Sequence, residues 1–459
     1  MSKDQEKLRV GEKLGYGLGD TASNIFFFGV NVWIFYYYTE ICHIPPATVG
    51  TLLLLPRIWD AISDPLMGLV ADRTRTRFGT YRPYLLWMAV PFGLAGYLTF
   101  ANPDFGDSGK LIYAYVTYIA LMTAYTAINV PYSALMGVMT PSSTERTKLS
   151  TFRFIGAFSG QLIISLTFLP LVLALGDGDK GEGFPKAMAL MASLATILFL
   201  ITFATTRERV KPPAQEKTDI KGDFKALLTN RPWVIMVAAA ILTLSSAAVR
   251  WTVMPQYLTY YFGVDDSKFF LFLDRISFVQ TTGTLAFITG VFFTGFCSRR
   301  FGKRNSLLVL TLLSGLTVLA VFFIPRDGYS TFVLVNIVGN LLAGPTPALV
   351  WSIYTDVADF SEWKSGRRVT GLAFSAAMFA QKLGISIGGP VCGWLLGGAG
   401  FKPGETPNDE VIESFRWIAS ILPGILAVAN GVVLFGYRLT NETLETIQRD
   451  LAERRGTTS

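Results

Sequence analysis

Two aspartates one helical turn apart, Asp60 and Asp64, are the residues of this sequence best placed to do chemistry. They lie inside an apolar run from about Thr48 to Ala71, which is long enough for a helix to cross a bilayer. Both carboxylates then face the same side of that helix. Ionised carboxylates at membrane depth are costly, and two neighbours repel each other unless a cation lies between them or one is protonated. The pair predicts a site for Na⁺, Li⁺ or H⁺; alternatively, Arg57 neutralises Asp60 in a purely structural group.

A second polar group lies in the run from Tyr125 to Tyr132. Thr126 and Asn129 are three residues apart, so they face the same way on a helix. Their oxygens are suited to complete a cation shell with the two aspartates, because hard cations take several oxygen ligands, and equally to hydrogen-bond a polyol. The structural alternative is that both serve helix packing around a kink at Pro131.

The first apolar span offers Tyr16, Asp20 and Asn24 on one helix face. Asp20 lies near the expected end of the helix, where an acidic residue complements the helix dipole. Asn24 lies deeper and is therefore the better candidate for a substrate contact.

Four further polar side chains lie in or at the edge of apolar runs: Arg153, Arg250, Gln381 and Lys382. A buried lysine needs an anionic partner or it loses its proton, and the second-span aspartates supply one if the two halves of the chain meet. Arg250 has polar and apolar neighbours on both sides, which makes simple snorkelling to the surface a weaker explanation. We expect it to pair with a carboxylate of the protein or of a substrate.

Three acidic residues at three-residue spacing, Asp356, Asp359 and Glu362, fall at the cytoplasmic end of the tenth span. We interpret them as a salt-bridge latch with Arg146 or Arg153 in one conformation of the protein.

Several chemistries lack the residues they need. The single histidine, His43, rules out a zinc site of the HExxH type. The sequence contains no GxxxxGK[ST] loop and no GxSxG elbow, so nothing indicates ATP hydrolysis or an enzyme. The three cysteines form neither a metal spacing nor a disulfide framework. We expect no cofactor besides a coupling cation.

The composition indicates a polytopic membrane protein. Of 459 residues, 51% are hydrophobic and only 16% are charged, and the mean hydropathy is +0.41. About twelve apolar spans are readable, and the first twelve residues are polar, which argues against a cleavable signal peptide. The net charge of +7 comes from basic residues in short connections, which indicates membrane topology rather than nucleic-acid binding. Their distribution predicts cytoplasmic termini and insertion in the inner (cell) membrane.

The spans fall into two halves. We predict an N-terminal six-helix bundle over 1–205, a cytoplasmic linker over 206–231, a C-terminal six-helix bundle over 232–438 and a cytoplasmic tail helix over 439–459. Arg77-Phe78-Gly79 after the second span is echoed by Arg300-Phe301-Gly302 after the eighth. A repeat offset by six spans predicts an all-α protein of two pseudo-symmetric bundles, the major facilitator fold. The tail has apolar residues at helical spacing, so we expect it to lie on the bundle or on the lipid surface.

Several motifs occur together and in order along the chain. They are Tyr-Gly-Leu-Gly near the start, Tyr-Tyr-Tyr-Thr closing the first span, Arg-Ile-Trp-Asp-Ala-Ile-Ser-Asp-Pro, Arg-Phe-Gly-Thr-Tyr-Arg-Pro, Asn-Val-Pro-Tyr and Asp-Val-Ala-Asp-Phe-Ser-Glu-Trp-Lys-Ser-Gly-Arg-Arg. With these motifs the chain resembles the glycoside–pentoside–hexuronide:cation symporter family over essentially its whole length.

The resemblance implies a set of site residues. It implies a cation site at Asp60, Ser63, Asp64 and Thr126, with Lys382 close to it, and sugar contacts from Asn24, Tyr125, Asn129 and Arg153. The family's melibiose carrier has aspartates at the Asn24 and Asn129 positions and asparagine at Ser63. These departures leave both the sugar and the cation open.

We therefore expect a secondary transporter, not an enzyme, that couples inward flow of Na⁺ or H⁺ to uptake of a small sugar or glycoside, and that functions as a monomer in the bilayer. Arg250 and Gln381 are further candidates for substrate contacts, and Arg250 would favour an anionic substrate such as a uronide. Other solutes, such as a lysolipid, are the alternative within this class. A membrane sensor without transport is the alternative from another class.

Overall fold

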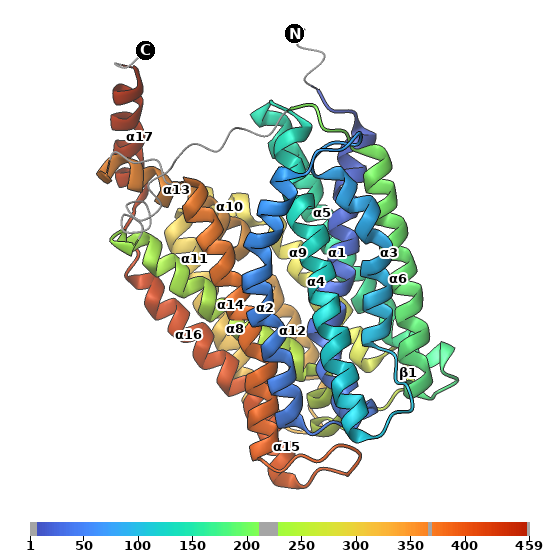
Figure 1. Cartoon of the computed structure of the whole chain (residues 1–459). Coiled ribbons are helices and arrows are strands. Elements are labelled where there is room, and N and C mark those ends of the chain that lie inside the picture. The colour runs from blue at the N-terminus through green and yellow to red at the C-terminus, as the bar shows by residue number, and fades with distance from the viewer. Residues whose placement is uncertain (1–6, 211–227, 366–369, 457–459) are drawn as a thin grey trace. The chain divides into compact units, whose positions relative to one another are not determined.

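The computed structural model describes residues 7–210, 228–365 and 370–456. These residues are predominantly helical, and their helices follow in order the twelve spans expected from the sequence (Figure 1). The described strands form one short antiparallel hairpin, β1 (Lys268–Phe270) and β2 (Leu273–Asp274). The protein is thus an all-α membrane protein, as predicted.

The chain divides into two compact units. The first comprises Met1–Ala214, Val264–Thr281 and Gly393–Pro407. The second comprises Gln215–Gly263, Thr282–Cys392 and Asn408–Ser459. Two helices, α9 (Arg275–Phe292) and α14 (Thr370–Gly398), contribute residues to both units.

The first unit contains the six N-terminal helices. They are α1 (Val10–Tyr36, continued by a π-helical turn over Tyr37–Ile41), α2 (Pro46–Arg73), α3 (Arg82–Thr99), α4 (Asp107–Met139), α5 (Ser143–Leu175) and α6 (Lys180–Thr205). Helix α1 packs along α5 and α6, α3 packs along α4 and α6, and α2 packs along α4. This packing brings side chains of α1, α2, α4 and α5 toward a common interior.

The second unit contains the remaining helices. Besides parts of α9 and α14, they are α8 (Arg231–Tyr261), α10 (Thr294–Phe301), α11 (Lys303–Ala320), α12 (Tyr329–Ala343), α13 (Thr346–Ser365), α15 (Asp409–Arg416), α16 (Leu422–Phe435) and α17 (Asn441–Gly456). A π-helical turn over Trp417–Ile421 joins α15 to α16. Helix α16 packs along α8 and α11, and α11 packs along α12.

Length and apolarity alone account for most of the spans. Seven helical segments of the described chain are long and apolar enough to cross a membrane, and α9 with α10, bent by 45°, makes an eighth. Helices α1, α2, α3 and α14 fill the other four places in the order of spans but are less apolar. In α2 this reflects the charged residues that drew attention in the sequence, which a membrane-spanning helix keeps only where they face protein or water.

Two sequence predictions fall partly outside the described residues. Most of the predicted linker, residues 211–227, lies outside them, as do Arg367 and Arg368 in the connection before α14.

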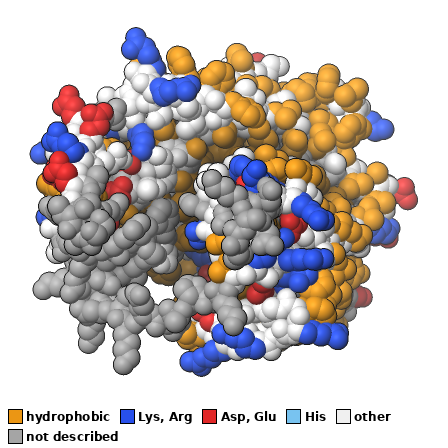
Figure 2. Space-filling view, turned by 90° about the horizontal axis from the view of Figure 1, so that it is seen from above, with side chains coloured by type: hydrophobic (Ala, Val, Ile, Leu, Met, Phe, Trp, Pro, Cys, Tyr) orange, Lys and Arg blue, Asp and Glu red, His pale blue; other side chains and the backbone are white. Residues whose placement is uncertain are grey.

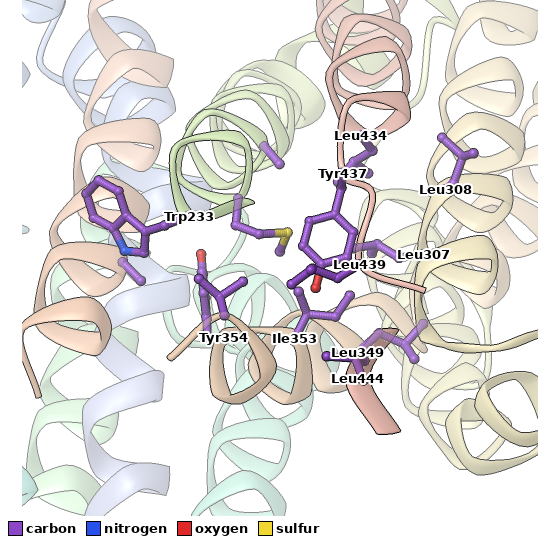
Figure 3. Packing of buried hydrophobic residues seen from close by; sticks show 14 of the residues in the cluster. Trp233, Leu307, Leu308, Leu349, Ile353, Tyr354, Leu434, Tyr437, Leu439 and Leu444 are labelled. Atoms are coloured by element: carbon purple, nitrogen blue, oxygen red, sulfur yellow. The ribbon is translucent and has the colours of Figure 1, made fainter. Parts of the chain in front are cut away.

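The tail helix α17 packs on the second unit. Leu444, Ile447 and Leu451 are buried in a cluster with residues of α8, α11, α13 and α16, part of which Figure 3 shows. The Trp363 indole of α13 donates a hydrogen bond to Asp450 Oδ2 at 2.9 Å. Of the two expectations for the tail, packing on the bundle is therefore the one observed.

Charged side chains gather where the helices end. Viewed from above, Lys and Arg side chains lie among Asp and Glu side chains, whereas hydrophobic side chains dominate one flank (Figure 2). In the first unit this end includes the ion pairs Lys13–Glu145 at 2.7 Å and Arg209–Glu12 at 2.6 Å. Such a division is typical of helices whose flanks face lipid and whose ends face water.

Candidate functional site

The two aspartates of α2 converge on one hydroxyl of α4. Thr126 Oγ1 lies 2.8 Å from Asp60 Oδ1 and 3.0 Å from Asp64 Oδ1. Asp60 and Thr126 retain only 4% and 2% exposure, and Asp64 is half-buried. Because α2 packs along α4, helical periodicity in each segment is enough to bring the three side chains together.

The Thr126 hydroxyl lies close to two carboxylate oxygens but has only one hydrogen to donate. A threonine hydroxyl has one hydrogen, so it can donate to only one of the two carboxylates at a time. Positive charge close to both oxygens, such as a proton on one carboxyl or a bound cation, stabilises the other contact. The group therefore has the properties of a site that takes up H⁺ or a hard monovalent cation.

The donor set does not resemble a transition-metal site. Among the described residues, no group of three or more His, Cys, Asp or Glu side chains is arranged to hold a metal ion. Carboxylate and hydroxyl oxygens instead suit hard cations.

Ser63 and Arg57 are neighbours of this group on α2. Ser63 is buried, and its hydroxyl donates to the Asp60 carbonyl at 3.3 Å. Arg57 donates from Nη2 to Asn31 Oδ1 of α1 at 3.3 Å, and within the described chain it forms no ion pair with Asp60. The alternative that Arg57 neutralises Asp60 in a structural group stays a prediction.

A polar chain continues from α4 to α1. Asn129 Oδ1 accepts a hydrogen bond of 2.7 Å from Ser23, and its Nδ2 donates to the Tyr125 carbonyl at 3.2 Å. Asn24, on the next position of α1, donates to the Asp20 carbonyl at 2.8 Å. The Asn24 amide and the Tyr125 hydroxyl are groups of the kind that a polyol site requires.

Arg153 of α5 is anchored by an ion pair with Asp20 of α1. The Nε–Oδ2 distance is 2.9 Å, and the guanidinium also lies over the Tyr132 ring, 5.3 Å from its centroid. Glycine at position 160 of α5 allows the two helices to approach closely here. A Cβ at this position would lie 2.6 Å from the Thr21 carbonyl oxygen of α1. Asp20 thus lies well inside its helix and does not serve only to complement a helix end.

The second unit contains the other predicted substrate residues. Arg250 lies on α8 and donates from Nη2 to Asn336 Oδ1 of α12 at 3.3 Å. Gln381 and Lys382 lie within α14. Their predicted roles, Gln381 in substrate binding and Lys382 beside the cation, stay predictions.

Two residues of the predicted latch, Asp356 and Arg146, form other contacts in this structure. Asp356 forms an ion pair with Lys303 at 2.8 Å, inside the second unit. Arg146 donates to the Pro141 carbonyl at 3.4 Å, and no ion pair of Arg146 occurs among residues of the described ranges. The latch that also involves Asp359 and Glu362 stays a prediction about another conformation.

Several residues of these groups were missed in the sequence. Ser23 and the Asp20–Arg153 pair depend on contacts between helices, which no spacing within one helix reveals. Asn336 and Asn340, by contrast, are four residues apart in an apolar span, and this spacing predicts one polar helix face.

Comparison with known proteins places these features in context. The model of a family described as MFS/sugar transport protein matches residues 15–441. The inner membrane symporter YicJ of Escherichia coli (strain K12) is 35% identical over 98% of this chain and 96% of its own length. The isoprimeverose transporter of Lactiplantibacillus pentosus is 32% identical over 91% of this chain and 87% of its own.

The fold also matches a solved structure at low sequence identity. A mutant of the nucleoside transporter NupG superposes with a TM-score of 0.68 at 13% identity, covering 93% of this chain and all of that one. At this identity the likeness concerns the fold alone, which is that of a membrane transporter.

Proposed function

Because the chain belongs to the MFS/sugar transport protein family, we propose that it couples the inward flow of Na⁺ or H⁺ to the uptake of a sugar or glycoside. The chain is a multi-pass membrane transporter and not an enzyme, as its family and relatives indicate. The names of the relatives, one an inner membrane symporter and one an isoprimeverose transporter, support the proposed coupling and substrate class.

The observation that carries the cation part is the contact of Thr126 with both second-helix aspartates. Two carboxylates that share one hydroxyl proton are stabilised by one further positive charge, whether H⁺ or an alkali cation. Two backbone carbonyl oxygens near this group are further candidate ligands, because a proline removes the N–H group that would bond each of them in a regular helix. Pro65 of α2 and Pro131 of α4 cannot donate to the carbonyls four residues earlier, those of Ala61 and Ala127. Each carbonyl follows directly after Asp60 or Thr126 in the sequence.

The sugar part rests on the polar groups beside that site. Asn24, Tyr125 and Asn129 offer hydroxyl and amide groups, and Arg153 offers guanidinium N–H groups, all within the interior of the first unit. Asn129 lies one turn from Thr126 on α4, so a sugar held at Asn129 would reinforce the helix position that the cation needs. This proximity supports coupled binding, followed by alternating access of the loaded carrier.

Orientation in the membrane belongs to the same proposal. The basic connections after the second and eighth spans support cytoplasmic termini in the inner (cell) membrane. A lysolipid substrate has no specific observation in its favour, because the candidate contacts are those of a polyol site.

The test is uptake into membrane vesicles of a panel of labelled glycosides, with a Na⁺ gradient and a proton gradient imposed separately. We expect one gradient to drive accumulation of at least one sugar, and Asp64→Asn to abolish it. Asp104→Asn, which changes an exposed loop carboxylate, is the matched control and should accumulate sugar as the wild type does. Accumulation by Asp64→Asn against a sugar gradient would refute the cation site, and absence of any gradient-driven sugar uptake would refute the proposed function.

A further inference from the structure

Ser23 of α1 presents a buried hydroxyl to α4. Only 1% of its surface is exposed, and its Oγ lies 2.7 Å from Asn129 Oδ1 and 3.0 Å from the Gly19 carbonyl oxygen of its own helix. Neither neighbouring oxygen has a hydrogen to donate, so the single hydroxyl hydrogen of Ser23 serves both contacts. A separation of 2.7 Å is that of an O–H···O hydrogen bond, and without a hydrogen between them the two oxygens would repel each other. Ser23 therefore donates to Asn129.

This bond holds the Asn129 amide in one orientation. Its Oδ1 accepts from Ser23, while its Nδ2 donates to the Tyr125 carbonyl at 3.2 Å. Turning the amide over would place Oδ1 against the Tyr125 carbonyl oxygen, and neither of these atoms carries a hydrogen. The amide nitrogen has two hydrogens, and the bond to Tyr125 uses one of them. The half-buried Asn129 thus carries a second N–H group in a fixed direction.

The Ser23 contact is the last of a stripe along α1 that faces α4. The Tyr16 hydroxyl donates to the Tyr132 carbonyl at 3.2 Å, and the Tyr132 hydroxyl donates to the Tyr16 carbonyl at 2.6 Å. A Cβ at Gly19 would lie 2.5 Å from the Tyr132 ring. Residues 16, 19 and 23 share one helix face. Because the first two contacts already fix how the helices lie against each other, loss of the Ser23 hydroxyl should act on Asn129 and leave the packing in place.

Asn24, the next residue of α1, takes its orientation from its own helix. Its Nδ2 donates to the carbonyl of Asp20, four residues earlier, at 2.8 Å. The two asparagines therefore differ in what holds them, because Asn129 of α4 is also held from α1 through Ser23. A change at Ser23 should thus alter the direction of the Asn129 amide and not that of Asn24.

We propose that Ser23 is a positioning residue of the sugar site, which holds the Asn129 amide so that its second Nδ2 N–H group faces a sugar oxygen. A donor that is held in advance loses less conformational freedom when the sugar binds, so the affinity is higher. Ser23 acts through Asn129 and does not itself touch the sugar. This inference rests on the proposed function, because it concerns the sugar contact assigned there to Asn129.

The test measures uptake into membrane vesicles at increasing concentrations of the methyl α- and β-glycosides of glucose, galactose and xylose. For a glycoside that is accumulated, Ser23→Ala should raise the concentration for half-maximal uptake by roughly 2- to 10-fold, the range that a neutral hydrogen bond contributes. Ser23→Cys keeps the size of the side chain but offers only a weak S–H donor, so it should raise that concentration as well. A wild-type half-maximal concentration in Ser23→Cys would mean that Ser23 acts by packing, and would overturn the proposal.

A double-mutant cycle tests whether Ser23 acts through Asn129. In an Asn129→Ala background, Ser23→Ala should raise the half-maximal concentration no further, because the amide that Ser23 positions is gone. An equal rise in both backgrounds would show that Ser23 affects sugar binding by another route, and would overturn the proposal. Where Asn129→Ala takes up no sugar, Ser23→Ala and Ser23→Cys decide alone.

Ser193→Ala is the matched control. This exposed serine of α6 donates to the Ala189 carbonyl of its own helix at 2.8 Å, and its loss should leave uptake as in the wild type. Thermal unfolding in detergent checks that each variant folds. If Ser23→Ala retains the wild-type half-maximal concentration, the inference is wrong and the symport stands. If the wild type accumulates no glycoside under a Na⁺ or a proton gradient, the proposed function fails and this inference fails with it.

Discussion

At the scale of single residues, the Thr126 hydroxyl is the contact most open to a direct test. Its Oγ1 lies within 3.0 Å of a carboxylate oxygen of both Asp60 and Asp64. Thr126→Val keeps the shape of the side chain and removes its hydrogen-bonding group. A hydrogen bond to a charged group contributes about 1.5–3 kcal/mol, so the cation concentration for half-maximal sugar uptake should rise by roughly 10- to 100-fold. Uptake at increasing Na⁺ or H⁺ concentration measures this shift.

Two variants of the same helix control that experiment. Thr126→Ser retains the hydroxyl and should keep a cation dependence close to that of the wild type. Ser108→Ala removes the hydroxyl of an exposed residue near the start of α4, far along the helix from Thr126, and should not change the cation dependence. A Thr126→Val protein with wild-type cation dependence would mean that the hydroxyl has no part in the cation site.

Residue spacing predicted part of this arrangement. The interval between Asp60 and Asp64 is a property of one helix, so the shared face was readable from the sequence. The Asp20–Arg153 ion pair was not, because it depends on the close approach of α1 and α5. The same limit applies to the hydrogen bond from Arg57 of α2 to Asn31 of α1, because it also joins two helices.

At the scale of elements, one carboxylate joins the connection between α2 and α3 to the end of α6. Glu208 accepts hydrogen bonds from the backbone N–H groups of Thr80, Tyr81 and Arg82 at 2.7–2.9 Å. It thereby caps the N-terminus of α3, whose first N–H groups have no partner within the helix. Gly79 has φ of +115°, and a Cβ there would overlap the Glu208 carboxylate.

Removal of this cap should loosen the first unit. Glu208→Ala leaves three N–H groups without their acceptor, and loss of a helix cap costs about 0.5–2 kcal/mol. We expect the apparent Tm in detergent to fall by several degrees. Glu182→Ala, which removes an exposed ion pair with Lys186, is the matched control and should change the Tm little. Equal Tm values for both variants would show that the cap contributes no stability.

Sequence patterns predicted which segments form helices more accurately than the residues at which those helices begin. The first helix begins at Val10, although the sequence analysis placed Asp20 near the end of its helix. Its early turns are polar, so hydropathy gives no sign of them. They are held by contacts across the unit, such as the Lys13–Glu145 ion pair. The spacing of its apolar residues predicted the tail helix. Its packing against α13 could not be predicted, because that contact depends on the folded structure.

At the scale of the whole molecule, the six-span repeat predicted the architecture because it depends on order along the chain. The echo of Arg77-Phe78-Gly79 in Arg300-Phe301-Gly302 marks equivalent connections of two halves. Which solute and cation the halves carry is not encoded by that repeat. By our proposal it depends on a few side chains, such as that of Asn129 on α4, whose partner Ser23 belongs to α1.

Symport by such a molecule makes a quantitative demand on its two ligands. If cation and sugar binding are coupled, sugar must tighten cation binding by the same factor as cation tightens sugar binding, because coupling free energy is reciprocal. A factor of roughly 5- to 150-fold is typical of such coupling. Titration calorimetry of the purified protein, with each ligand in the absence and presence of the other, measures both factors.

The two factors should agree for the wild type and for the exposed-loop variant Asp104→Asn. Asp64→Asn should bring both toward one, because the variant can no longer bind the cation whose charge offsets the repulsion between the α2 carboxylates. Sugar affinity that is indifferent to both Na⁺ and pH in the wild type would contradict coupling altogether. An Asp64→Asn protein that keeps the wild-type coupling factor would mean that the coupling does not depend on this carboxylate.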